Sequence, residues 1–279
     1  MRPSRIALGA VTAVATALAA VAVGLAAIGV NLAQAQGGDM EAVVKDYLAA
    51  RPEEARRLVK DYLVRNPQVL QEALVEQRQR DSRAAIKSNA AALYNSGKQV
   101  TLGNPKGDVT LVEFVDYNCG FCRRALGDML ELIRSDANLK VVLFQHPVLG
   151  AGSAEAARIA IAVQMQDRGP AKYLEFHRKL MAGPGPANKA RARAVAADLG
   201  IDVARIDADL ARPEIDATIE ESKKLARALG IRGTPSYVLC DSIIFGAVGI
   251  GPLRSKIAAA RQAQQDSGQR CEFYAFDRP

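Results

Sequence analysis

The sequence predicts an α/β protein in which a sheet carries a helical insertion and follows an N-terminal α-helical segment. Three observations lead to this fold class. Residues 39–97 show helical periodicity and no strand-like run. From about residue 99, short strand-like runs alternate with helical patterns. Between residues 171 and 229 a series of helical patterns interrupts this alternation, before a final hairpin and helix.

The first residues carry the features of an export signal. Arg2 and Arg5 precede an apolar stretch, residues 6–30, that contains no charge, and Ala33-Gln34-Ala35 follows it. A basic start, an apolar run and an Ala-x-Ala site predict a signal peptide over residues 1–35, cleaved after Ala35. The apolar stretch is also long enough to cross a bilayer, so a retained anchor is the alternative. Either way, the rest of the chain is expected to be exported.

The charge distribution and the cysteines indicate which classes of function to expect. The 279 residues carry a formal net charge of +7, and their basic and acidic residues are interleaved rather than gathered in blocks. This pattern gives no sign of nucleic-acid binding. All four cysteines lie beyond residue 118, and an exported protein with an even number of cysteines normally pairs them.

The segment 36–97 contains a short repeat. Val44-Lys45-Asp46-Tyr47-Leu48 recurs as Val59-Lys60-Asp61-Tyr62-Leu63, and a proline follows each copy, at Pro52 and Pro67. Since proline suits the first turn of a helix, we expect two short helices and then a longer one over about 67–94. Helices this short need packing partners.

The apolar residues of these helices pack either on the chain's own second domain or on the same segment of other subunits. We favour the second alternative, because the polar stretch 76–87 suits a solvated stalk between two bodies. Residues 36–97 are therefore predicted to be an oligomerisation segment. The apolar residues that need partners are Met40, Val44, Tyr47, Leu48, Leu58, Tyr62, Leu63, Leu70 and Leu74.

Residues 98–279 are predicted to form the catalytic domain. Strands are expected over 100–102, 109–115 and 140–145, and a closing hairpin over 236–239 and 243–248. Helical spacing predicts helices over 123–134, 154–166 and 252–265.

Cys119-Gly120-Phe121-Cys122 lies where the second of these strands gives way to a helix. Disulfide exchange needs one thiol that attacks as a thiolate and a second that resolves the mixed disulfide. The start of a helix favours a thiolate, and the second cysteine then lies one turn further on. The rival interpretation, half of a zinc site, lacks a second ligand pair, because His146 and His177 are the only histidines. No cofactor beyond the redox-active disulfide and no metal site is expected, although copper binding by the two thiols stays possible.

The stretch from Leu111 to Arg123 resembles the active-site strand and helix of DsbA-like thioredoxin-fold proteins. Phe176-His177 and the run Gly233-Thr234-Pro235-Ser236-Tyr237-Val238 fall where that family has its helical insertion and its cis-proline loop. Together with the N-terminal helices, these motifs most closely resemble the suppressor-of-copper-sensitivity protein C (ScsC) group of periplasmic proteins. The resemblance therefore implies a thioredoxin fold and a location in the periplasm.

The resemblance assigns three residues besides the two catalytic cysteines. Glu113, six positions before Cys119, matches the buried carboxylate behind the active site, which would accept a proton from Cys122. Pro235 would be the cis-proline, and Thr234 would present backbone groups to an extended substrate.

Gly120-Phe121 contains no histidine between the cysteines, which indicates a less oxidising disulfide than that of the strongest oxidases. This favours an isomerase or reductase acting on misfolded or copper-stressed proteins. The ScsC resemblance further implies a homotrimer. Isomerisation requires Cys119 to be kept reduced, which implies a membrane thiol reductant of the DsbD or ScsB kind. A dithiol oxidase and a copper-binding or holdase module remain the alternatives.

Cys240 ends the strand after Pro235, and Cys271 lies beyond the last predicted helix. We expect these two to form a structural disulfide that holds the C-terminal tail. A second redox or metal-binding pair is the alternative, although neither cysteine begins a predicted helix.

Overall fold

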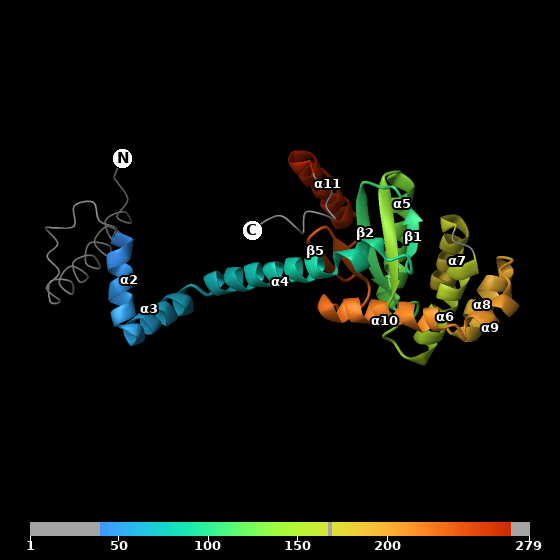
Figure 1. The fold of residues 1–279 in the computed structure, drawn as a ribbon, viewed down its shortest axis with the longest axis horizontal. Coiled ribbons are helices and arrows are strands. Elements are labelled where there is room, and N and C mark those ends of the chain that lie inside the picture. The colour runs from blue at the N-terminus through green and yellow to red at the C-terminus, as the bar shows by residue number, and fades with distance from the viewer. Residues whose placement is uncertain (1–39, 167–168, 269–279) are drawn as a thin grey trace, which may run out of the picture. The chain divides into compact units, whose positions relative to one another are not determined.

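The computed structural model describes residues 40–166 and 169–268, and the predicted signal peptide and Cys271 lie outside them. The chain divides into two compact units, one ending at Ala73 and the other beginning at Leu74 (Figure 1). None of the described helices is long and apolar enough to cross a membrane.

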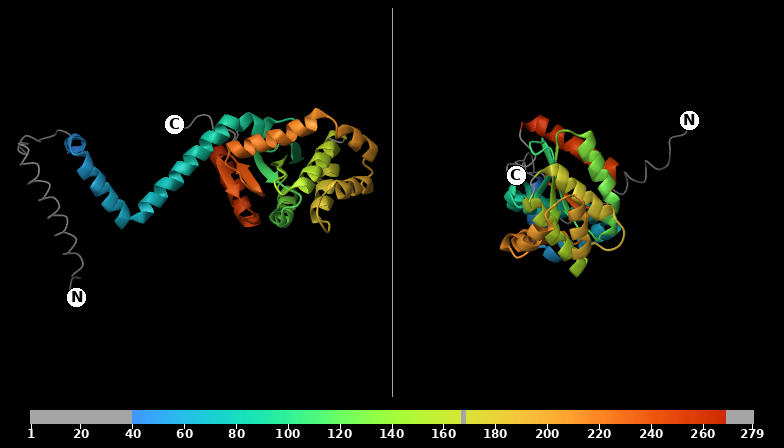
Figure 2. Two further views of the ribbon diagram at one scale, coloured as in Figure 1. Left: turned by 90° about the horizontal axis from the view of Figure 1, so that it is seen from below. Right: turned by 90° about the vertical axis from the view of Figure 1, so that its right-hand side faces the viewer.

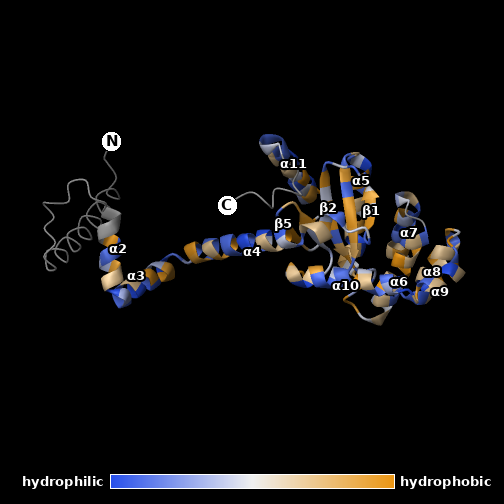
Figure 3. Ribbon diagram, viewed as in Figure 1, coloured by the Kyte–Doolittle hydropathy of each residue, from blue (hydrophilic) through white to orange (hydrophobic). Residues whose placement is uncertain are grey.

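The first unit contains α2 (Met40–Ala50), α3 (Pro52–Arg65) and the start of α4 (Pro67–Asn95). Pro52 and Pro67 occupy the first positions of α3 and α4, where a missing N–H breaks no helical hydrogen bond. No side chain of α3 is buried, although the helix carries hydrophobic residues (Figure 3). The large apolar residues that are more than a third exposed in this unit are Val44, Leu48, Leu58, Val59, Tyr62, Val64 and Leu70.

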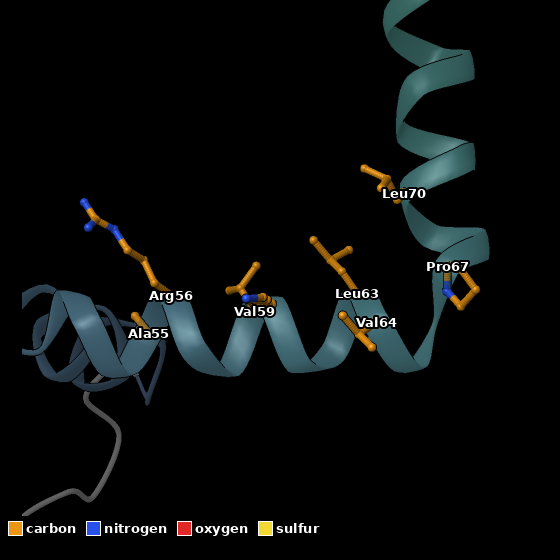
Figure 4. Close-up of a pocket in the computed structure, with 8 residues that line it drawn as sticks. Ala55, Arg56, Val59, Leu63, Val64, Pro67 and Leu70 are labelled. Atoms are coloured by element: carbon orange, nitrogen blue, oxygen red, sulfur yellow. The ribbon is translucent and has the colours of Figure 1, made fainter.

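Three of these exposed residues, Val59, Val64 and Leu70, line a pocket between α3 and the first turn of α4. In Figure 4, Leu63 and Leu70 lie on its two sides and Val59 continues the α3 wall. Arg56 and Lys60 are the charged residues of its lining. The first unit therefore has a mainly apolar hollow within a surface that its own side chains leave uncovered.

The second unit is built on a five-stranded sheet in the order β1-β3-β2-β4-β5. β2 and β3 are parallel, and the other neighbouring strands are antiparallel. β1 pairs with β3, so the two strands joined by the 104–108 turn are not neighbours. The strands are β1 (Val100–Gly103), β2 (Val109–Val115), β3 (Leu139–Gln145), β4 (Ser236–Leu239) and β5 (Ser242–Phe245).

Helices cover both faces of this sheet (Figures 1 and 2). All seven residues of β2 are buried, as a central strand between two helical layers requires. α5 (Gly120–Ser135) and α11 (Ile250–Ser267) pack on one face, whose core also receives residues of the helical insertion. The insertion comprises α6 (Ala151–Gln166), α7 (Pro170–Ala182), α8 (Lys189–Asp198), α9 (Val203–Asp209) and α10 (Pro213–Ala228).

The opposite face is covered by the end of α4 and the end of α10. Ile86 and Leu93 of α4 are fully buried against Phe114 and Phe144 of the sheet. The Tyr94 hydroxyl donates a hydrogen bond to the Cys240 carbonyl at 2.9 Å. The last turns of α4 are therefore part of the second unit's core, even though the helix begins in the first unit. Together with the five-stranded sheet, these layers confirm the predicted α/β class and its preceding helical segment.

The burial of Leu93 leads to a testable prediction. Leu93→Ala should lower the free energy of unfolding by about 2–5 kcal/mol, because the lost side chain leaves a cavity against the sheet. Leu149→Ala, which shortens a leucine that is 53% exposed, is the matched control and should change it by less than about 1 kcal/mol. Urea unfolding of both variants provides the comparison. Equal effects of the two substitutions would contradict the assignment of α4 to this core.

Candidate functional site

Cys119 lies at the junction between β2 and α5. It is the N-cap residue of α5, with extended backbone angles of φ −76° and ψ 115°, and Cys122 follows in the first turn. Both are free thiols, 6% and 2% exposed respectively. The positive end of the helix dipole therefore lies beside the first thiol, as thiolate chemistry requires.

The loop before β4 contacts the Cys119 thiol. The Cys119 thiol donates a hydrogen bond to the Thr234 carbonyl over 3.1 Å. The Thr234–Pro235 peptide bond is cis, as its Gly-Thr-Pro context predicts. The structure thus brings Cys119, Thr234 and Pro235 together, although more than a hundred residues separate them in the sequence.

Glu113 lies in the middle of β2, opposite Tyr237 of β4. Its side chain is buried, and the Oε2 atom has no hydrogen-bond partner. Burial, with a smaller contribution from Asp128, raises the pKa of this carboxyl from 4.5 to about 8. Glu113 is therefore able to gain and lose a proton near neutral pH.

Cys122 interacts electrostatically with this carboxyl. Burial is the main cause that raises the pKa of the Cys122 thiol well above its ordinary value. Hydrogen bonds from the Asp116 backbone and the Thr234 side chain act in the opposite direction, and the charge of Glu113 adds to the rise. Ionisation of Cys122 therefore becomes easier when Glu113 is protonated.

Asp116 holds the loops around the active site, a role that its position beside the motif did not reveal. Its Oδ1 accepts a hydrogen bond from the Asn118 N–H at 2.8 Å. Its Oδ2 accepts from the N–H groups of Val148 and Leu149, at 2.8 and 3.1 Å. Its backbone carbonyl accepts from the Cys119 N–H. One buried carboxylate thus connects the turn before Cys119 with the loop after β3.

A second buried polar group links this turn to the insertion. The Tyr117 hydroxyl lies 3.1 Å from Nδ1 of His177 and 3.3 Å from the Tyr173 hydroxyl, both on α7. The Gln145 amide donates to the Tyr173 hydroxyl at 3.0 Å. Burial lowers the pKa of His177 to about 4, so the ring is neutral. His177 is therefore a buried, neutral residue that binds the turn before Cys119, and a lone histidine in the sequence does not indicate this hydrogen bond.

His146 lies at the end of β3 and is also buried, with its ring at the edge of Phe114. Its Nδ1 atom has no partner, and burial is the main cause that lowers its pKa. The side chain packs against Phe114 on the face of the sheet that α4 and α10 cover, whereas the two cysteines belong to the core on the other face. This placement agrees with a structural residue.

Cys240 is disulfide-bonded, and it occupies the turn between β4 and β5 with a φ of 53°. Its predicted partner Cys271 lies outside the described residues. Within the described part of the chain, no group of three or more His, Cys, Asp or Glu side chains is arranged to hold a metal ion.

Two parts of the chain match known protein families. Residues 110–258 match the family described as DSBA-like thioredoxin domain, and residues 56–84 match the N-terminal domain of the copper resistance protein ScsC. The first match covers β3, β4, β5 and nearly all of β2, together with both cysteines and the cis-proline loop, while β1 lies before it. The second covers most of α3 and the first part of α4.

Three solved structures illustrate the similarity. A thioredoxin-like oxidoreductase from Silicibacter pomeroyi is 40% identical, with a TM-score of 0.59 over 62% of this chain and 97% of the other. A linker-deletion variant of Proteus mirabilis ScsC is 29% identical, with a TM-score of 0.65 over 76% of this chain and 95% of that one. A periplasmic thioredoxin-like protein from Salmonella enterica serovar Typhimurium is 26% identical, with a TM-score of 0.52 over 61% and 93% of the two chains.

The match covers more than half of the chain and contains the thiol pair, the buried carboxyl and the cis-proline loop. The chain therefore belongs to the DSBA-like thioredoxin family of thiol–disulfide oxidoreductases.

Proposed function

We propose that this protein is a periplasmic disulfide isomerase or reductase that acts through Cys119 and Cys122. The observation that carries the proposal is the position of the Cys119 thiol, at the start of α5 and 3.1 Å from the Thr234 carbonyl. The absence of a histidine between the cysteines favours rearrangement over oxidation. The match of residues 56–84 to ScsC points in the same direction.

In the proposed reaction, the Cys119 thiolate attacks one sulfur of a substrate disulfide. A bond forms between Cys119 and that sulfur, and the other substrate sulfur leaves as a thiolate. This thiolate then attacks a different disulfide of the substrate, and a final attack on the mixed disulfide releases Cys119 unchanged. If release is slow, Cys122 attacks Cys119 instead. The substrate is then freed in reduced form and the protein keeps a disulfide, which a membrane thiol reductant must reduce.

Glu113 is the proposed proton acceptor for Cys122 in this second route. Its carboxyl, with a pKa of about 8, is partly ionised at neutral pH and can take the thiol proton as the Cys122 sulfur attacks. Thr234 and Pro235 are proposed to contact the substrate, through the backbone of the loop before β4.

The exposed apolar side chains around the thiol suit partly unfolded protein substrates. Phe121 lies between the two cysteines, and Val148 and Leu149 follow the loop held by Asp116. Phe245 precedes Gly246, whose N–H donates to the Pro235 carbonyl. Each of these four side chains is at least 44% exposed. A rim of this kind binds apolar segments that a folded protein hides.

The first unit is proposed to join three copies of the chain. Its apolar residues are exposed in the single chain, and a pocket opens among them (Figure 4). Other copies of the same surface would bury these residues, and three active sites would then serve one bound substrate. Export through residues 1–35 would place this assembly in the periplasm, where disulfides persist.

Substitution of the attacking thiol tests the proposed activity. Cys119→Ala should abolish refolding of scrambled ribonuclease, because no mixed disulfide can form. Cys122→Ala should retain part of the isomerisation, because only the resolving route is lost. Unchanged refolding by Cys119→Ala would refute the enzymatic proposal.

Thiol trapping in cells distinguishes an isomerase from an oxidase, since the cysteines of an isomerase are kept reduced and those of an oxidase are kept oxidised.

Glu113→Gln tests the buried carboxyl through its pH dependence. A carboxyl whose pKa is raised from 4.5 to about 8 keeps in the folded protein a proton that the unfolded chain loses. Relative to Glu113→Gln, which shares all other titrating groups, the free energy of unfolding of the wild type should therefore fall between pH 4.5 and pH 8, by on the order of 4 kcal/mol. Glu113→Gln should lack this fall and be the more stable protein at pH 8.

The measurement is urea unfolding at several pH values between 5 and 8. Glu113→Gln should also slow the release of a mixed disulfide by Cys122, by about a hundredfold. Parallel pH profiles for the wild type and the variant would contradict the raised pKa. An unchanged release rate would contradict the proton transfer.

The proposed trimer can be tested by comparing the full mature chain with a shortened one. Sedimentation of the mature chain should show a trimer, and removal of residues 36–73, which leaves α4 from Leu74 onward, should give a monomer. The second unit keeps the buried end of α4 in this shortened chain, so it should still fold and react with oxidised glutathione. A monomer in both cases would refute the proposed trimer and favour the oxidase alternative.

A further inference from the structure

The residue before the attacking cysteine is attached to the helical insertion. The Asn118 Nδ2 group donates to the Ala187 carbonyl at 2.8 Å, and the Ala187 N–H donates back to Asn118 Oδ1 at 2.7 Å. The same Nδ2 group donates to the Ser153 hydroxyl on α6 at 3.0 Å. The three bonds use the amide's acceptor and both of its N–H donors.

The surroundings of this contact are close-packed. Ala187 is fully buried, and Ser153 is 1% exposed. At Gly152, a Cβ atom would lie only 3.0 Å from the Ala187 carbonyl and 3.7 Å from Asn118 Nδ2. The backbone of α6 therefore approaches the contact as closely as a glycine allows. A two-point bond to a buried backbone fixes the orientation of the Asn118 side chain as well as its position.

The other end of the cysteine motif is attached to the same loop. The Arg123 guanidinium donates to the carbonyls of Gly183 and Gly185, at 3.3 and 2.8 Å. The loop itself is held by Arg191, which donates to the carbonyls of Leu180 and Gly185. Residues 183–187 thus bind the chain on both sides of the two cysteines. Of these attachments, the Asn118 contact lies nearest the attacking thiol in sequence.

We propose that Asn118 is a positioning residue, which holds Cys119 where Cys122 can reach it and so sets how readily the two cysteines form their disulfide. This inference rests on the proposed thiol–disulfide exchange and not on its direction. Two reacting groups that are held in place react as if at a high local concentration. Loss of the attachment should lower that concentration, because the turn before Cys119 gains freedom.

Glutathione provides the chemical probe. Oxidised glutathione and the reduced protein first give a mixed disulfide at Cys119 and one glutathione thiolate. Cys122 then attacks the Cys119 sulfur, the Cys119–Cys122 bond forms and the second glutathione leaves as a thiolate. Two electrons pass from the protein to glutathione, and the released thiolates take up the protons that the cysteines lose. The equilibrium constant of this reaction measures how well the two cysteines are placed.

Asn118→Ala should lower this equilibrium constant by about three- to tenfold, the equivalent of roughly one lost hydrogen bond. The attack of Cys122 on the mixed disulfide should slow by a similar factor. Ser153→Ala keeps both bonds to Ala187 and should give a smaller shift in the same direction. In an Asn118→Ala background the same Ser153 change should add nothing, because the shared interaction is already gone.

Asn104→Ala is the matched control. Asn104 also holds a turn by two backbone contacts, since its Nδ2 donates to the Ala137 carbonyl and its Oδ1 accepts from the Lys106 N–H. This turn lies between β1 and β2, outside the active site. Asn104→Ala should leave the equilibrium constant unchanged, even if it lowers the free energy of unfolding.

A purely structural role for Asn118 would lower the stability of the dithiol and disulfide forms equally and leave the equilibrium constant at its wild-type value. That result would overturn the inference. If Asn118→Ala does not fold, Ser153→Ala decides, and an unshifted constant in that variant has the same consequence. Failure of the wild type to exchange with glutathione would instead overturn the proposed function.

Discussion

β2 is buried over its whole length, and the chain that leaves it turns directly into α5, so the position of Cys119 depends on how this strand is fixed. Helices cover both faces of the strand, and β3 and β4 pair with its two edges. β4 begins immediately after the cis Thr234–Pro235 bond. Pairing of β2 with β4 therefore brings the Thr234 carbonyl to the Cys119 thiol. The Cys119 sulfur, which is 6% exposed, is in this way held at the end of a strand whose residues are all buried.

The burial of β2 also explains why the pKa values of Glu113 and Cys122 are raised. A carboxyl in the middle of a fully buried strand is shielded from solvent, and no hydrogen bond compensates the Glu113 Oε2 atom. The neutral form is favoured, which raises the pKa to about 8. Cys122 is buried in the same layer, and its pKa is raised for the same reason. The charge of Glu113 adds to this rise, so Cys122 ionises more easily when Glu113 holds the proton.

Local patterns predicted much of the fold. The repeated Val-x-x-Tyr-Leu spacing and the two prolines gave the starts of α3 and α4, and the apolar run 109–115 gave β2. Contacts between distant segments were harder to predict. Nothing around Asn118 indicates that it binds Ala187, sixty-nine residues later, because the contact uses the backbone of an alanine. The polar stretch of α4 suggested a stalk, yet Ile86, Leu93 and Tyr94 belong to the core of the second unit. A helix that is exposed at one end and buried at the other has no single periodic pattern.

The two parts of α4, before and after Ile86, have different surroundings. The match to the ScsC N-terminal domain ends at residue 84, and the first buried residue of the helix is Ile86. The part before this point carries exposed apolar side chains, and the part after it is fixed to the sheet. An association of the first units would therefore leave each catalytic core intact, since no core residue takes part in both. Under the proposed trimer, a substrate held at one apolar rim meets the thiols of the other copies at a raised effective concentration. Rearranging a protein with several wrong disulfides needs repeated attack on the same molecule, which a single thiol site that releases its substrate after each exchange performs less well.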